Sequence, residues 1–173
     1  MIAASAFFVS VLFLSSLTAL AQTDGQKAHA KLHNAQGKTV GTATLTESNG
    51  GVRIAANLRD LPQGQHALHI HAVGTCTPPN FESAGDHFNP YGKQHGLQDP
   101  DGAHAGDLPN IVVEPDGTVS ISTVAQHVTL ASGKNSLLRE QGTALVIHAK
   151  ADDHRTDPSG NSGDRIACGV ITK

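Results

Sequence analysis

The sequence predicts an all-β domain, folded as an antiparallel sandwich or barrel of about eight short strands. Apolar and polar residues alternate over several short segments, as they do in strands that bury one face. Turn signals rich in glycine, proline and asparagine separate these segments. Glycine is plentiful, with 18 residues, whereas aromatic residues make up only 3% of the chain. This composition favours short strands joined by turns over a helical bundle.

A signal peptide is predicted at residues 1–21, followed by a single domain at residues 22–173. Residues 7–20 are apolar and end in Ala19-Leu20-Ala21, a small-x-small cleavage signal. The apolar segment is shorter than the ~20 residues of a membrane span. No cysteine that could carry a lipid follows Ala21. We therefore expect a protein exported to the periplasm or the medium, with no membrane attachment after cleavage.

The charge of the chain excludes one large class of partner. The formal net charge is −3 at pH 7, whereas nucleic-acid binding needs a basic face that neutralises phosphates. We expect no nucleic-acid partner. A mature chain of roughly 150 residues is long enough for one domain with a sizeable core.

The strands follow one another at short intervals. Asn49-Gly50-Gly51 and Pro115-Asp116-Gly117-Thr118 are turn signals between neighbouring strands. The eight predicted strands lie at residues 27–34, 38–46, 52–58, 66–71, 111–113, 119–122, 143–150 and 165–172.

Two long segments lack the strand pattern. Residues 74–109 and 151–164 are rich in Gly, Pro, Asp and Ser, and the first also holds several histidines. Long loops without regular structure in a compact domain are usually functional or disordered. The density of metal-binding residue types favours function here. In residues 135–141 we expect a turn of helix.

The run His66-Ala67-Leu68-His69-Ile70-His71 carries the strongest functional signal. Residues two apart in a strand point to the same face, so His69 and His71 lie side by side while Leu68 and Ile70 pack into the core. Neutral imidazole is the commonest metal-binding side chain, and strands hold ligands rigidly. The pair alone is also compatible with two surface histidines.

Further candidate ligands follow along the chain. His148 ends an apolar strand, from which it can face the pair, and His95, His104 and Asp107 share one loop. Three imidazoles and a carboxylate form a closed zinc set, and four imidazoles suit Cu²⁺. The pattern indicates two neighbouring metals without identifying them. The remaining candidates between His66 and His148 are His66, His87, Asp86, Asp99 and Asp101.

Cys76 and Cys168 are the two cysteines of the chain. In an exported protein an even pair indicates a disulfide. A metal site with two thiolates is a weaker alternative, because neither cysteine belongs to a Cys-x-x-Cys pair.

Several stretches together resemble the copper/zinc superoxide dismutases, in particular the bacterial, exported members of that family. The stretches follow the family's order and span nearly all of the mature chain. They comprise residues 64–71, 83–90, 95–96, 104–110, 145–153 and 163–171. The resemblance implies an eight-stranded Greek-key sandwich or barrel with two long functional loops.

The resemblance also implies the ligands, with one copper and one zinc per chain. Copper would be held by His69, His71, His87 and His148. Zinc would be held by His87, His95, His104 and Asp107. In this scheme His87 is an imidazolate bridge, and Asp152 lies outside the ligands and accepts hydrogen bonds from His69 and His95. A disulfide between Cys76 and Cys168 would pin the first loop to the last strand.

The implied activity is the disproportionation of superoxide to O₂ and H₂O₂. Arg165 would dock the superoxide anion, because its guanidinium is always charged, and His87 would supply a proton. Asp164 stands where the family usually has a small neutral residue, and Asp86 adds another negative charge beside His87, so both would weaken the attraction for superoxide. We expect local attraction to come from Lys93, Lys134, Lys150 and Arg155.

Two alternatives to this enzyme stay open at this point. A copper-binding or copper-delivery protein could use the same scaffold without turnover. A zinc hydrolase would need an open zinc position and a general base, for which the sequence offers little. The sequence is compatible with a monomer and with a homodimer. His29, His33, His127 and His154 match no ligand position, and we expect them at the surface.

Overall fold

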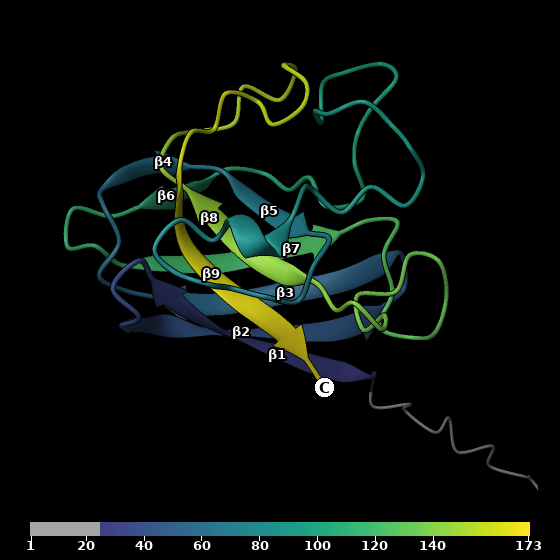
Figure 1. Cartoon of the computed structure of the whole chain (residues 1–173), viewed down its shortest axis with the longest axis horizontal. Coiled ribbons are helices and arrows are strands. Elements are labelled where there is room, and N and C mark those ends of the chain that lie inside the picture. Colours follow the sequence, from purple (N-terminus) through teal and green to yellow (C-terminus); the bar gives the residue numbers. More distant parts are fainter. Residues whose placement is uncertain (1–24) are drawn as a thin grey trace, which may run out of the picture.

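Residues 25–173 are described by the computed structural model (Figure 1). The predicted signal peptide and its cleavage site lie outside these residues. Within the described part of the chain, no helix is long and apolar enough to cross a membrane.

An antiparallel sheet of seven strands forms the body of the domain, in the order β5-β8-β9-β1-β2-β3-β7, and β4 pairs with β6 in a separate ribbon. The chain leaves β3, forms three strands elsewhere and returns beside β3 as β7, a Greek-key crossover. The strands are β1 Lys27–Asn34, β2 Thr39–Ser48, β3 Gly51–Leu58, β4 Gly64–His66, β5 Leu68–His71, β6 Ile111–Val113, β7 Val119–Ala125, β8 Ala144–His148 and β9 Arg165–Thr172.

Alternation of side chains explains the first hairpins. In β1 the buried residues are Ala28, Ala30 and Leu32, and the residues between them are exposed. The turn after β2 is tight, because Ser48 pairs with Gly51. Gly50 and Gly51 have φ angles of 105° and 136°, which glycine adopts without strain. The prediction of a hairpin here is confirmed.

β8 is buried along its whole length, because the core lies on one side and a loop covers the other. Leu145 and Ile147 belong to the main core. Ala144 and Val146 face a smaller cluster that includes Phe81 and Cys168. Cys168 is bonded to Cys76, 92 residues earlier in the sequence, so the predicted disulfide is confirmed. It fastens the long loop between β5 and β6, called the 74–110 loop below, to β9.

The structure differs from the sequence predictions in two places. The described residues contain nine strands rather than eight, because the run from Gly64 to His71 breaks at Ala67. Residues 135–141 form turns and no helix. The N–H of Leu137 donates to Thr129 O, and Thr129 forms an isolated β-bridge with Ser136, so this segment pairs across the loop instead of along a helix. Both long loops are present as predicted, with one short 3₁₀ turn, η1 Glu82–Ala84, in the first.

Candidate metal centre

β5 and β8 place the first three histidines. His69 and His71 lie on β5, with ring centroids 6.5 Å apart, while Leu68 and Ile70 lie in the main core, as the alternation predicts. β5 pairs with β8, so His148 at the end of β8 faces the same site. The ring centroids of His148 and His69 are 4.9 Å apart.

The 74–110 loop is bonded along the other edge of β5. Ile70 N donates to Gly106 O, and Phe88 N donates to Ile70 O, each at 2.8 Å. Gly106 is required, because a Cβ there would collide with the carbonyl oxygen of Ile70. These bonds set His87 opposite His71 and Asp107 opposite His69.

The first ligand cluster is formed by four buried imidazoles, whose facing nitrogens all lie within 4.8 Å of one another. The Nε2 atoms of His71 and His148 are 3.3 Å apart. Within the described structure, His69 Nδ1 and His87 Nε2 are buried without a hydrogen-bond partner. The cluster comprises His69, His71, His87 and His148.

A second cluster gathers around the carboxylate of Asp107. Its Oδ1 lies 2.9 Å from His87 Nδ1, 3.2 Å from His95 Nδ1 and 3.4 Å from His104 Nδ1. Its Oδ2 accepts hydrogen bonds from the N–H groups of Gly96 and His104, both at 3.0 Å, and these fix the carboxylate. His87 therefore presents Nε2 to the first cluster and Nδ1 to the second.

Hydrogen bonds to groups outside the two clusters fix the orientation of the histidine rings. Asp152 accepts from His69 Nε2 at 2.7 Å and from His95 Nε2 at 3.1 Å, which joins the two clusters. Gly160 is required beside it, because a Cβ there would collide with the Asp152 carboxylate. His71 Nδ1 donates to Gly85 O at 2.8 Å, and His148 Nδ1 donates to Gly163 O at 3.1 Å. In His69, His71 and His148 this bond leaves the opposite ring nitrogen as a lone pair aimed into the site.

Burial keeps the first cluster neutral. Loss of solvation lowers the pKa of His71 to about 2, of His148 to about 3 and of His87 to about 4. Neutral imidazole is the form that ligates metals. His71 and His148 can therefore each bind a metal at neutral pH without releasing a proton, whereas His87 releases one if both of its nitrogens bind cations.

In the second cluster, by contrast, the pKa of a histidine is raised. Burial lowers the pKa of His95, but the carboxylates of Asp107 and Asp152 beside its ring outweigh it and raise the pKa to about 9. Burial opposes ionisation of Asp107 as well, and its close contacts with His104, His87 and His95 hold its carboxyl pKa well below the usual range. A cation bound here replaces the shared protons as the partner of this carboxylate.

The donor sets fit two metals. Four nitrogens suit copper, and three nitrogens with one carboxylate oxygen suit zinc. The orphaned nitrogens of His69 and His87, and that of His95, point into these sets. Four other candidates from the sequence do not join either cluster, namely His66, Asp86, Asp99 and Asp101.

His66 has a structural contact instead of a ligand position. Its two ring nitrogens face the carbonyl oxygens of His148, at 2.8 Å, and of Pro62, at 2.9 Å. The ring thereby clamps β4 to the end of β8. The expectation for His154 is wrong: its side chain is only 17% exposed and its Nδ1 lies 3.7 Å from Asp152 Oδ1.

The two clusters open into a cavity of about 770 Å³, whose lining includes His71, His87, His104 and His148. Arg165 reaches this cavity with its guanidinium held by Phe81 O and Gly85 O, each at 2.7 Å. Of the four other cations expected to attract an anion, Lys93 lines the cavity and Lys134, Lys150 and Arg155 do not.

Arg139 lines the same cavity and packs over the ring of Phe88, with 5.8 Å between its Cζ and the ring centroid. This residue was not predicted from the sequence. It lies in the loop where a helix was expected, and no local pattern connects it to the histidines.

Two carboxylates near Arg165 lie on different sides of it. Asp86 is exposed and lines the metal cavity together with Arg165. Asp164 lines a neighbouring depression of about 450 Å³ with Asn34 and Asp60. Asp86, rather than Asp164, therefore places its negative charge at the mouth of the metal site.

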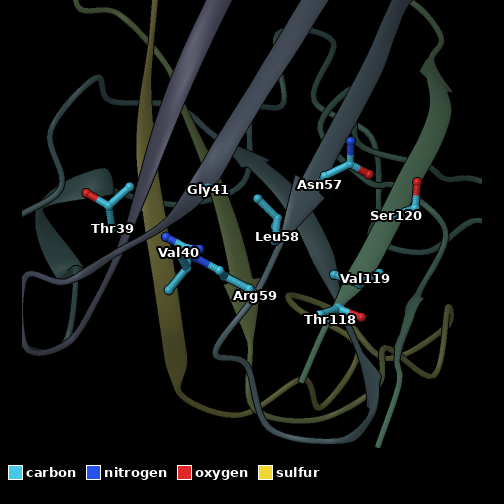
Figure 2. Close-up of a pocket in the computed structure, with 9 residues that line it drawn as sticks. All are labelled: Thr39, Val40, Gly41, Asn57, Leu58, Arg59, Thr118, Val119 and Ser120. Atoms are coloured by element: carbon cyan, nitrogen blue, oxygen red, sulfur yellow. The ribbon is translucent and has the colours of Figure 1, made fainter. Parts of the chain in front are cut away.

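A second groove, of about 460 Å³, lies at the ends of β2, β3 and β7 (Figure 2). Its polar lining consists of hydroxyl and amide side chains such as Thr39, Asn57 and Ser120, together with Arg59. It shares no lining residue with the histidine cavity.

Comparisons with known proteins agree with this geometry. The family model described as copper/zinc superoxide dismutase matches residues 39–171. The copper–zinc superoxide dismutase 2 of Aquifex aeolicus is 54% identical over 147 residues, which are 84% of this chain and 86% of that protein. The copper–zinc superoxide dismutase of Caulobacter vibrioides is 42% identical, with 83% and 84% covered.

Solved structures give the same result. A double mutant of a SOD-like protein from Bacillus subtilis matches with a TM-score of 0.81 at 46% identity, covering 84% of this chain and 97% of that one. The copper/zinc superoxide dismutase from Brucella abortus matches with a TM-score of 0.70 at 32% identity, covering 84% and 99%.

In the metal-free protein, stability should decrease as the pH falls below about 6.5. His71, His87 and His148 take up protons near pH 6.5 when unfolded, but stay neutral in the fold down to about pH 4 or lower. The unfolded state then binds more protons, which favours unfolding. We expect Tm to fall by on the order of 10 °C between pH 6.5 and pH 4 in calorimetry of the apoprotein.

The raised pKa of His95 gives a slope of opposite sign, but only above pH 6.5, where the folded state holds the extra proton. An apoprotein whose Tm stays level from pH 6.5 to pH 4 would contradict the burial of neutral rings.

Proposed function

We propose that this chain, which belongs to the copper/zinc superoxide dismutase family, converts superoxide to dioxygen and hydrogen peroxide. The observation that carries the proposal is the shared ring of His87. One nitrogen of this ring faces the other three imidazoles of the first cluster, and the other nitrogen faces the Asp107 carboxylate. A ring with both nitrogens committed to cations is stable as an imidazolate, because two positive charges replace its proton.

The ligand assignment follows from the donor sets. In the proposal copper is held by His69, His71, His87 and His148, and zinc by His87, His95, His104 and Asp107. Zinc has no redox chemistry and completes a closed four-ligand set, so it is structural and electrostatic. Bound copper supplies one-electron chemistry, accepting an electron from one superoxide and returning it to a second.

His87 and Arg165 are the residues proposed to act on the substrate. Arg165 presents a permanently charged guanidinium at the cavity, with its position fixed by two backbone carbonyls. Superoxide is a small anion and docks against this charge. The reduced substrate needs two protons to become hydrogen peroxide. His87 would supply one from Nε2, in the state in which no metal holds that nitrogen, and water would supply the other and reprotonate the ring.

A copper carrier on the same scaffold is the second candidate. A carrier needs the copper ligands but has no use for a docking cation or a closed zinc set beside them. Both features are present here: the Arg165 guanidinium is half-buried and hydrogen-bonded at the cavity, and the zinc set is buried beside the copper set. Turnover therefore explains the site better than transport does. A zinc hydrolase is less favoured, because His95, His104, Asp107 and His87 already complete the zinc set.

Export is part of the proposal. The apolar residues 7–20 and the cleavage signal ending at Ala21 support secretion to the periplasm or the medium. The disulfide between Cys76 and Cys168 supports an oxidising compartment. A homodimer stays a prediction of the sequence.

Superoxide decay measured by pulse radiolysis tests the activity. The mature protein loaded with copper and zinc should give rapid decay that scales with bound copper. Arg165→Ala should lower kcat/KM by about tenfold or more, because the attraction of a charged substrate is lost. Its metal content should be unchanged. Decay no faster than that of the metal-free protein, with both metals bound, would instead support the copper carrier.

Charge at the cavity mouth should tune the rate. Removing one negative charge there changes the energy of an approaching anion by about 0.5 kcal/mol in a high dielectric. Asp86→Asn should therefore raise kcat/KM about twofold at low ionic strength, and added salt should erase the gain. Asp164→Asn is the matched control and should have a smaller effect, since it lines the other depression. Equal effects of the two variants would refute this role for Asp86.

Secretion predicts a defined N-terminus. When the full chain is expressed in a bacterium with an export pathway, the protein recovered outside the cytoplasm should begin at Gln22. N-terminal sequencing or intact mass measures this directly. Recovery of the uncleaved chain in the cytoplasm, with a reduced Cys76–Cys168 pair, would remove the export proposal.

A further inference from the structure

We propose that Asn110 is a positioning residue for both metal sites: it fixes the main chain of Asp152, whose carboxylate orients one ring of each ligand set. The proposal rests on the ligand assignment above. It concerns a residue that touches neither ligand cluster and that the strand and ligand patterns of the sequence do not single out.

The side chain of Asn110 holds Asp152 in two directions. Its Oδ1 accepts the N–H of Asp152, and its Nδ2 donates to the carbonyl of Asp152, both at 2.8 Å. The amide thus satisfies the donor and the acceptor of one residue, as a neighbouring strand would. This fixes the amide orientation, because a flipped side chain would set two carbonyl oxygens against each other.

The second hydrogen on Nδ2 of Asn110 extends the contact. It lies toward Nε2 of His154, with 3.2 Å between the two nitrogens. Nε2 is then the acceptor of the neutral ring, so Nδ1 carries the hydrogen on the side of Asp152 Oδ1. The main-chain N–H of His154 donates to the same oxygen, at 2.6 Å. Asn110 therefore fixes the surroundings of the carboxylate as well as its backbone.

The short side chain of Asp152 transmits the effect of Asn110 to both clusters. Asp152 has only two side-chain torsions, so a fixed backbone largely determines where its oxygens lie. Those oxygens accept from His69 at 2.7 Å and from His95 at 3.1 Å. Asn110 follows the carboxylate ligand Asp107 by three residues and precedes β6, so it ties the 74–110 loop to the 151–164 loop.

The test uses metal binding rather than turnover. In Asn110→Ala the zinc affinity, measured by competition with a chromophoric chelator, should fall about tenfold, the lower end for loss of an outer hydrogen-bond partner. Co²⁺ placed in the zinc set and Cu²⁺ in the copper set should both show shifted d–d absorption bands. Asn135→Ala is the control. It removes a bond to His127 O at 2.8 Å in another loop, and it should leave affinities and spectra unchanged.

Asn110→Asp supplies the second variant. It keeps the size and the acceptor, but it cannot donate to the Asp152 carbonyl, so it should shift the zinc affinity and both spectra in the same direction. Wild-type affinities and spectra in either Asn110 variant would overturn the proposal. So would failure of both variants to fold in the presence of zinc and copper, since Asn110 would then serve the fold. A wild-type protein that binds both metals without dismutation would refute the proposed function and leave this inference intact.

Discussion

The free edge of β5 is the constraint on which the metal centre depends. Ile70 accepts a backbone hydrogen bond from Phe88 and donates one to Gly106, so two distant parts of the 74–110 loop are fixed to the same strand residue. The strand itself carries His69 and His71 on one face. Because backbone bonds set the register, His87 and Asp107 come opposite these rings. The ligands are thus aligned by main-chain pairing before any metal binds.

Aligning these side chains costs free energy, because polar and charged groups are buried and lose their hydration. Neutral imidazoles are packed together away from water, and the carboxylates of Asp107 and Asp152 are buried beside them. Each buried polar group needs a partner to offset its lost hydration. Hydrogen bonds provide part of this, but the inward nitrogens of His69, His87 and His95 are left over. Bound cations satisfy them, so metal loading and stability of the folded state are coupled.

Much of this arrangement could be predicted from the sequence, because its signals are local. Period-two alternation marked the strands, and the spacing of His69 and His71 marked a ligand pair. What the sequence could not reveal depends on the path of the loops. Arg139 reaches the cavity, Asn110 meets Asp152, and Leu137 bonds across its loop instead of forming a helix. Loops lack a repeating pattern, so no periodicity predicts which of their residues meet.

The carbonyl oxygen of Gly85 accepts hydrogen bonds from both His71 and Arg165. One atom therefore serves a ring of the proposed copper set and the cation proposed to dock the substrate. A displacement of this peptide would disturb redox geometry and anion capture simultaneously, and kinetics alone could not apportion the loss between them. Substitutions between Cys76 and His87 that alter the redox geometry are therefore expected to alter anion capture as well. This coupling limits the number of substitutions by which the rate can evolve.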